Sequence, residues 1–195
     1  MADIATSAGR SALADALGEV DVLVNNAAAF AAYGPLEDVS AADLARVVDT
    51  IVVAPLHLGA AVLPGMKRRG FGRIVNIGSV AAGLGAERQA VYASAKSALY
   101  GFTKSVALEG ARFGVTCNLL DLGLIATERI AEAVPEKIQR ELIAHTPLGR
   151  AGTVEEVADA VAFLVSTRAS FITGAAIPVS GGLGLGLFPY GPEAR

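Results

Sequence analysis

The stretch that decides the fold is Gly72-Arg73-Ile74-Val75-Asn76-Ile77-Gly78-Ser79. Its short apolar run is typical of a buried β-strand. A helical pattern over positions 89–113 follows it and stops at Gly114, the residue type that most often ends a helix. A strand followed by a long helix favours a parallel sheet whose faces are covered by helices.

The same alternation continues in both directions along the chain. Apolar runs predict further strands at 21–25, 115–120 and 175–179. Helical patterns lie at 11–17, 40–69, 128–145 and 153–166, with Ser40 and Thr153 as caps and a break at Pro135. No repeat or low-complexity linker divides the sequence. We therefore predict a single α/β domain over residues 1–195.

The chain is apolar enough to require a search for membrane spans. Hydrophobic residues make up 53% and charged residues 18% of the sequence. The most apolar stretch, 50–66, is interrupted by Pro55, His57, Gly59 and Pro64. A membrane-spanning helix needs about 20 largely apolar residues, so we expect a buried core helix and no membrane partner. Met1 is followed by a polar segment without the basic start of a signal peptide, and the expected location is cytoplasmic.

Composition argues against several other classes of function. The single cysteine, Cys117, excludes an intramolecular disulfide and a cysteine-based zinc site. The two histidines are too few and too far apart for a metal cluster, so we expect no metal. The net charge of −3 offers no basic surface for nucleic acid.

The chemistry is concentrated in Tyr92-Ala93-Ser94-Ala95-Lys96, inside a predicted helix. A spacing of four places Tyr92 and Lys96 on the same helix face. A cation beside a phenol favours the phenolate and makes the hydroxyl a better acid–base group. An ordinary surface pair would show the same spacing.

A third polar residue, Ser79, follows the predicted strand at 73–77. Ligands bind at the carboxyl ends of strands in parallel α/β sheets. The Ser79 hydroxyl could therefore hydrogen-bond a carbonyl or an alcohol beside Tyr92, although a simple turn residue would also fit this position.

These motifs together resemble one family. The segments at 72–79 and 92–96, Asp21-Val22-Leu23-Val24-Asn25-Asn26-Ala27-Ala28 and the loop at 122–127 resemble the short-chain dehydrogenase/reductase family, near its 3-oxoacyl-acyl-carrier-protein reductase branch. The segments 172–174 and 180–182 resemble its last strand and turn. The resemblance implies a Rossmann-like, doubly wound parallel sheet. It also implies an NAD(P)-dependent oxidoreductase that interconverts a secondary alcohol and a ketone.

The resemblance assigns three catalytic roles. Tyr92 would be the general acid–base, and Lys96 would lower the pKa of Tyr92 and hold the nicotinamide ribose. Ser79 would orient the oxygen of the substrate. The cofactor supplies the hydride, and the protein supplies position and a proton.

The resemblance also implies six cofactor-binding positions besides Tyr92 and Lys96. Two would line NAD or NADP, two would meet its carboxamide, and two would lie near its adenine. In that order they are Asn26 and Ala27, Ile125 and Thr127, and Asp3 and Ile4.

The largest departure from the family pattern is at the start of the sequence. The family's Thr-Gly-x-x-x-Gly-x-Gly turn is not found, and residues 2–4 resemble the end of its third strand. We therefore expect an N-terminally truncated sheet without its first two strands, weak binding of NAD or NADP, and an exposed edge at the strand 21–25. The alternative function is that of a cofactor-free fragment with only a binding or oligomer-forming role.

Smaller departures lie within the matched region. Ile51 stands where the family has an asparagine that holds a water of the proton relay, and Leu122 and Ala28 replace a proline and a glycine. Pro55 inside the long helix predicts a kink. The helix at 89–113 and the end at 175–182 match the family's usual contact surfaces, so we expect a homo-oligomer, either a dimer or a tetramer.

Overall fold

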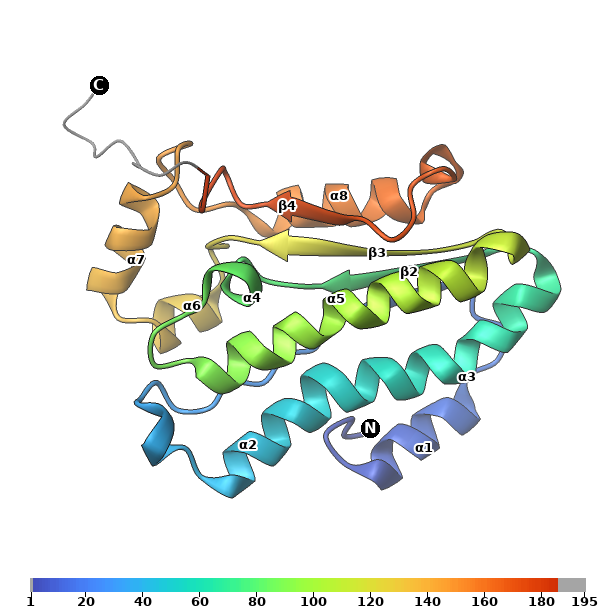
Figure 1. Ribbon diagram of the computed structural model, residues 1–195, viewed down its shortest axis with the longest axis horizontal. Helices are drawn as coiled ribbons and strands as arrows, with labels where there is room; N and C mark the ends of the chain where they lie inside the picture. Colours follow the sequence, from blue (N-terminus) through green and yellow to red (C-terminus); the bar gives the residue numbers. More distant parts are fainter. Residues whose placement is uncertain (1, 186–195) are drawn as a thin grey trace.

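Four parallel strands form the centre of the protein, as a computed structural model shows for residues 2–185 (Figure 1). The strands lie in the order β1-β2-β3-β4, and every neighbouring pair is parallel. Their bounds are Val22–Asn25, Gly72–Ile77, Val115–Leu122 and Ala176–Val179. The α/β parallel sheet that the sequence predicted is confirmed.

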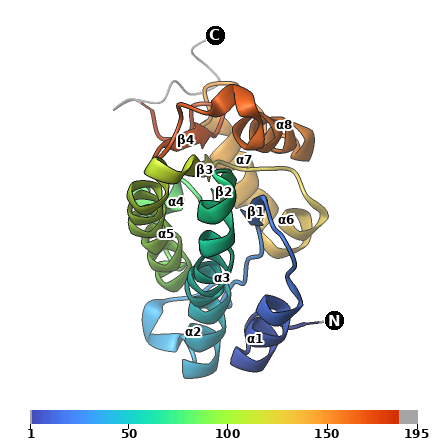
Figure 2. The ribbon, with the colours of Figure 1, turned by 90° about the vertical axis from the view of Figure 1, so that its right-hand side faces the viewer.

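Helices connect the strands and cover both faces of the sheet. Helix α5 lies on one side and α8 on the other (Figure 2). The helices are α1 (Ser7–Ala16), α2 (Ala41–Val48), α3 (Ala54–Arg69), α4 (Ala81–Leu84), α5 (Ala90–Gly110), α6 (Glu128–Ala133), α7 (Glu136–Ala144) and α8 (Val154–Val165). The short helix α4 was not predicted, and Pro135 separates α6 from α7 as expected.

The alternation of side chains along the central strands explains the layers. Ile74 of β2 packs with Met66 of α3 and Val106 of α5 on one face of the sheet. The next residue, Val75, points to the opposite face and packs with Leu164 of α8. Strands buried on both faces read as continuous apolar runs, which is why β2 could be recognised from the sequence.

Local signals set the helix ends. The Ser40 side chain accepts a hydrogen bond from the Asp43 backbone N–H at 3.0 Å, and Thr153 and Glu156 form a complete capping box at α8. Gly70 ends α3 with φ of 69°, in the left-handed region where glycine has no steric cost. The predicted caps are confirmed.

Helices α2 and α3 form one long helix through a π-helical turn, Asp49–Val53. Pro55 lies directly after this turn, inside the continuous helix, and has no N–H to donate to the preceding turn. The stretch Ala41–Arg69 is the one described helix long and apolar enough to cross a membrane, but half of its apolar window is buried in the protein. Met66, for example, is fully buried. The expectation of a core helix at 50–66 is confirmed.

For the N-terminal part of the sheet, the expected exposed edge is confirmed and the expected strand end at residues 2–4 is wrong. Within residues 2–185, β1 pairs only with β2, and Val22 and Val24 are 40% and 38% exposed. The predicted exposed edge is therefore present. Residues 2–4 are not part of a strand, because the chain turns there and the Thr6 side chain caps α1. Their assignment to a strand end was wrong.

A buried leucine and an exposed leucine of helix α5 together test these packing assignments. Leu99 is 2% exposed and Leu108 on the same helix is 82% exposed. Leu99→Ala should lower the free energy of unfolding by about 2–5 kcal/mol, because it leaves a cavity in the core. Leu108→Ala should change it by less than about 0.5 kcal/mol. Urea unfolding measures both, and equal effects would contradict the assigned orientation of α5.

Candidate active site

Ser79 and Tyr92 meet at the carboxyl end of β2. Ser79 follows the strand by two residues, and its Oγ accepts a hydrogen bond from the Ala81 backbone N–H at 3.3 Å, at the start of α4. Its hydroxyl also hydrogen-bonds the side chain of Tyr92 near the start of α5. The short connection through α4 thus brings the two predicted hydroxyl groups together.

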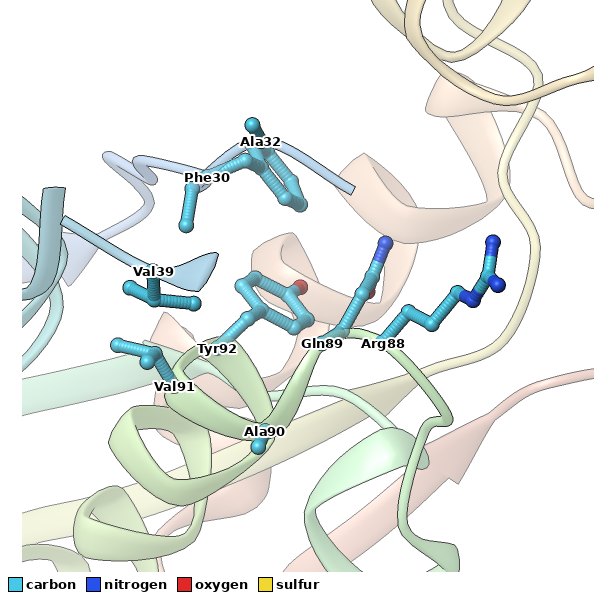
Figure 3. A pocket seen from close by; sticks show the side chains of 9 residues that line it. Phe30, Ala32, Val39, Arg88, Gln89, Ala90, Val91 and Tyr92 are labelled. Atoms are coloured by element: carbon cyan, nitrogen blue, oxygen red, sulfur yellow. The ribbon is translucent and has the colours of Figure 1, made fainter. Parts of the chain in front are cut away.

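The phenol of Tyr92 lies in a mostly apolar environment. Burial raises its pKa, while the hydrogen bond with Ser79 and the positive charge of Arg129 act in the opposite direction. The Phe30 ring stacks on the Tyr92 ring, with 4.7 Å between the ring centroids and 19° between the planes (Figure 3). The Arg129 guanidinium lies 4.7 Å from the centroid of the same Phe30 ring. A phenol with a raised pKa carries its proton at neutral pH. The expectation that Lys96 lowers the pKa of Tyr92 is wrong, because the groups that act in this direction are Ser79 and Arg129 and the pKa is raised overall.

Lys96 lies one helical turn after Tyr92 and is only 2% exposed. Its Nζ donates a hydrogen bond to the Ile77 carbonyl at 2.6 Å and lies 5.7 Å from the Tyr92 ring centroid. Burial lowers the pKa of Lys96 to about 8, and the negative charge of Asp121 opposes this shift. The predicted triad of Ser79, Tyr92 and Lys96 therefore forms one cluster.

A cavity of about 330 Å³ opens beside this cluster. Its polar lining side chains are Tyr33, Ser79, Glu87, Gln89 and Tyr92. The rest of the lining comes from the loops after β1, β2 and β3, from α4, α6 and α7, and from Leu183. The large apolar side chains of its lining are Phe30, Val80, Leu84, Leu122, Leu124, Ile130, Val134, Ile138, Leu142 and Leu183. An apolar cavity with a few convergent polar groups is typical of a small-molecule site.

Four of the predicted cofactor-binding residues lie at the same edge of the sheet. Asn26 and Ala27 directly follow β1, and both are exposed. Ile125 follows β3 and pairs with Gly152, and Thr127 caps α6 by accepting a hydrogen bond from the Ile130 backbone N–H at 3.2 Å. The carboxyl ends of β1 and β3 thus bring these residues to the edge that carries Ser79.

Asp3 and Ile4 lie elsewhere in the structure, beside α1. The Asp3 carboxylate accepts a hydrogen bond from the Ala5 backbone N–H, and the Ile4 carbonyl accepts one from Arg10. Arg10 in turn forms an ion pair with Asp49 at 3.3 Å, at the start of the π-helical turn. No described contact joins Asp3 or Ile4 to the Ser79–Tyr92 cluster.

Ile51 lies in the core behind the site. Its side chain is 1% exposed and packs in the cluster that contains Ala95 and Leu99 of α5, with Tyr92 at its border. An aliphatic side chain neither donates nor accepts a hydrogen bond. The position therefore offers apolar packing and cannot hold a water.

Comparisons with known proteins agree with this site geometry. A family model described as Enoyl-(Acyl carrier protein) reductase matches residues 3–184. The chain belongs to the short-chain dehydrogenase/reductase family. It is therefore an oxidoreductase, and the resemblance seen in the sequence motifs is confirmed.

Individual relatives of this short-chain dehydrogenase/reductase include reductases of acyl thioesters. The chain is 40% identical over 172 residues to the 3-oxoacyl-acyl-carrier-protein reductase FabG of Vibrio cholerae, covering 88% of the chain and 70% of that protein. It is 41% identical over 167 residues to the acetoacetyl-CoA reductase of Shinella zoogloeoides, covering 85% of the chain and 68% of that protein.

A solved structure extends the likeness to the fold. A gluconate 5-dehydrogenase from Burkholderia cenocepacia, in complex with NADP and tartrate, superimposes with a TM-score of 0.87 at 32% identity. The match covers 95% of this chain and 74% of that one. The chain thus spans about two thirds to three quarters of the length of these relatives.

Four residues of the site, Phe30, Tyr100, Asp121 and Arg129, were not predicted from the sequence. Phe30 stacks on Tyr92 from the loop after β1, and Tyr100 of α5 hydrogen-bonds Asp121 of β3. The one available signal was Asp121, a carboxylate at the end of an otherwise apolar strand. The contacts of Phe30 and Tyr100 depend on how distant segments pack.

Proposed function

We propose that this short-chain dehydrogenase/reductase catalyses the NAD(P)-dependent interconversion of a ketone and a secondary alcohol, with Ser79, Tyr92 and Lys96 as its catalytic residues. The observation that carries the proposal is their cluster at the carboxyl end of β2, beside an apolar cavity. A protonated acid, a hydroxyl and a buried cation are the groups that a carbonyl reduction requires from the protein.

In the reductive direction, Tyr92 acts as the general acid. When bound, a reduced nicotinamide supplies the hydride to the carbonyl carbon. Tyr92 donates its proton to the carbonyl oxygen, and the Ser79 hydroxyl donates a hydrogen bond to that oxygen as negative charge develops. The raised pKa of Tyr92 suits this direction at neutral pH, because the phenol carries its proton. The positive charge of Arg129 stabilises the phenolate that remains.

The described residues fit the nicotinamide half of the cofactor. An ammonium group has three N–H donors, and Lys96 uses one of them on the Ile77 carbonyl. Two donors therefore remain for ribose hydroxyls. Asn26, Ala27, Ile125 and Thr127 are the further proposed cofactor-binding residues at this edge. We retain Asp3 and Ile4 as proposed adenine neighbours on the family resemblance alone.

The cavity favours a substrate with an apolar chain next to its carbonyl group. Its lining is mostly apolar, with Tyr33, Ser79, Glu87, Gln89 and Tyr92 as the polar side chains. Two relatives carry names of acyl thioester reductases, FabG and acetoacetyl-CoA reductase. We therefore propose a 3-oxoacyl thioester as the substrate class and its 3-hydroxyacyl product.

The comparisons favour this oxidoreductase over a cofactor-free fragment with only a binding role. We further propose that the protein is cytoplasmic and a homo-oligomer. Exposed apolar side chains on α5 and just after it support a contact between copies, since Leu108 is 82% and Phe113 47% exposed.

Substitution of the proposed acid and cation tests the mechanism. Tyr92→Phe should reduce kcat by about 10²-fold or more, because the acid–base hydroxyl is lost while the ring stack with Phe30 is kept. Lys96→Met should reduce kcat and also weaken cofactor binding. NADPH-dependent reduction of acetoacetyl-CoA, followed by the loss of NADPH absorbance at varied NADPH concentrations, measures both effects.

A matched control separates these effects from a general loss of charge. Lys104 lies on the same helix and is exposed, so Lys104→Met should leave kcat and cofactor affinity near their original values. Retention of most activity in Tyr92→Phe would refute its assignment as the general acid.

The affinity for the cofactor is a separate prediction. The 195-residue sequence contains no Gly-rich turn of the family pattern, and such turns bind the pyrophosphate through backbone N–H groups. We expect the 195-residue chain to bind NADH and NADPH more weakly than about 100 μM, equivalent to about −5 kcal/mol. Isothermal titration calorimetry measures this, and a micromolar dissociation constant for either would contradict the expectation.

A further inference from the structure

Asp121 places a buried carboxylate directly behind the proposed active site. It lies at the carboxyl end of β3, opposite the segment that contains Ser79, and is 7% exposed. An isolated buried charge is costly unless other charges and hydrogen bonds compensate it. The neighbours of Asp121 therefore show what this carboxylate does.

Two neighbours hold the carboxylate in place. The Tyr100 hydroxyl donates a hydrogen bond to Oδ2, and burial raises the pKa of Tyr100 to about 12, with Asp121 adding to the shift. Tyr100 is thus a permanent donor at neutral pH. On the other side, Oδ1 lies so close to Gly78 that a Cβ at that position would be 2.6 Å away. The glycine makes room for the carboxylate between β2 and β3.

Hydrogen bonds compensate the negative charge of the Asp121 carboxylate only in part. Its Oδ1 has no hydrogen-bond partner of normal geometry among the described residues. Burial raises the pKa of Asp121, and Tyr100, the Ser79 backbone N–H and Lys96 lower it. Part of the negative charge is therefore available to a nearby cation.

Lys96 is that cation, and its other neighbours carry no full charge. Its Nζ donates to the neutral Ile77 carbonyl. The titratable groups around it are Tyr92 and Tyr100 on its own helix and Asp121 on β3, while Arg129 of α6 acts on Tyr92. The adjacent core position, Ile51, is aliphatic. Lys96 and Asp121 meet the same short segment, because Nζ of Lys96 donates to the Ile77 carbonyl and Oδ1 of Asp121 faces Gly78. Asp121 is therefore the carboxylate beside Lys96, and its negative charge opposes the lowering of the Lys96 pKa.

We infer that Asp121, held by Tyr100, is a positioning residue that keeps Lys96 as a buried cation beside Tyr92. The inference rests on the proposed function for its catalytic meaning, because the ammonium group of Lys96 is the proposed donor to the ribose of the cofactor. Removal of the carboxylate leaves Lys96 buried without a counter-charge. A buried ammonium then loses its proton at a lower pH, since burial disfavours the charged form.

Direct titration of Lys96 tests the inference without cofactor or substrate. In protein labelled with ¹³C-lysine, the shift of the Lys96 ε-methylene reports its protonation, and Lys96→Arg assigns the signal. In the unsubstituted chain, the Lys96 ammonium group should titrate with a pKa of about 8, well below the value of about 10.4 for free lysine. Asp121→Asn, which keeps the shape of the side chain, should lower this midpoint by about one pH unit or more.

Two variants separate charge from packing. Tyr100→Phe removes the hydrogen bond but keeps the carboxylate, so the Lys96 midpoint should move by less than half as much as in Asp121→Asn. Asp159→Asn removes an exposed carboxylate on α8 and should leave the midpoint unchanged. In the active enzyme, the alkaline loss of kcat should shift to lower pH in Asp121→Asn by the same amount.

The outcomes distinguish this inference from the proposed function. An unchanged midpoint in Asp121→Asn, or equal shifts in Asp121→Asn and Tyr100→Phe, would overturn the role of Asp121. A Lys96 midpoint below pH 7 in the unsubstituted chain would also overturn the role of Asp121, because Lys96 would then not be a cation at neutral pH. This outcome can be measured even if Asp121→Asn does not fold. A chain that titrates as expected but reduces no ketone would contradict the proposed function and leave the counter-charge in place.

Discussion

The hydrogen bond from Lys96 Nζ to the Ile77 carbonyl connects the two parts of the site. It joins α5, which carries Tyr92, to the end of β2, which leads into Ser79. Because an ammonium group inside a protein must have polar partners, the bond limits how α5 can lie on the sheet. The apolar contacts of α5 with α3, β2 and β3 then complete the packing around a fixed polar contact.

Much of this arrangement could be predicted from the sequence, because its signals are local. All six residues of β2 are buried, and the strand accordingly appears as an apolar run. The capping box at Thr153 and the left-handed Gly70 each mark a helix end by chemistry within a few residues. The spacing of Tyr92 and Lys96 on one helix is likewise a local property. Their meeting with Ser79 follows once β2 and α5 are placed.

Other features depend on contacts between distant segments and could not be predicted. Phe30 reaches Tyr92 across sixty or so positions of sequence only because β1 lies beside β2. The Asp121–Tyr100 hydrogen bond requires β3 to lie under α5. The π-helical turn before Pro55 relieves a local conflict by changing the hydrogen-bond pattern. Residues 2–4 do not form the predicted strand end, because the described residues include no neighbouring strand that could pair with them.

The central proposal is hydride transfer from a nicotinamide to a ketone at the carboxyl edge of the sheet, beside Ser79 and Tyr92. The most direct test uses NADPH in which both C4 hydrogens of the nicotinamide are replaced by deuterium, together with acetoacetyl-CoA and the protein. Mass spectrometry of the product should find 3-hydroxybutyryl-CoA with one deuterium bound to the former carbonyl carbon. A product without deuterium, or no product at saturating concentrations of both reactants, would contradict the claim.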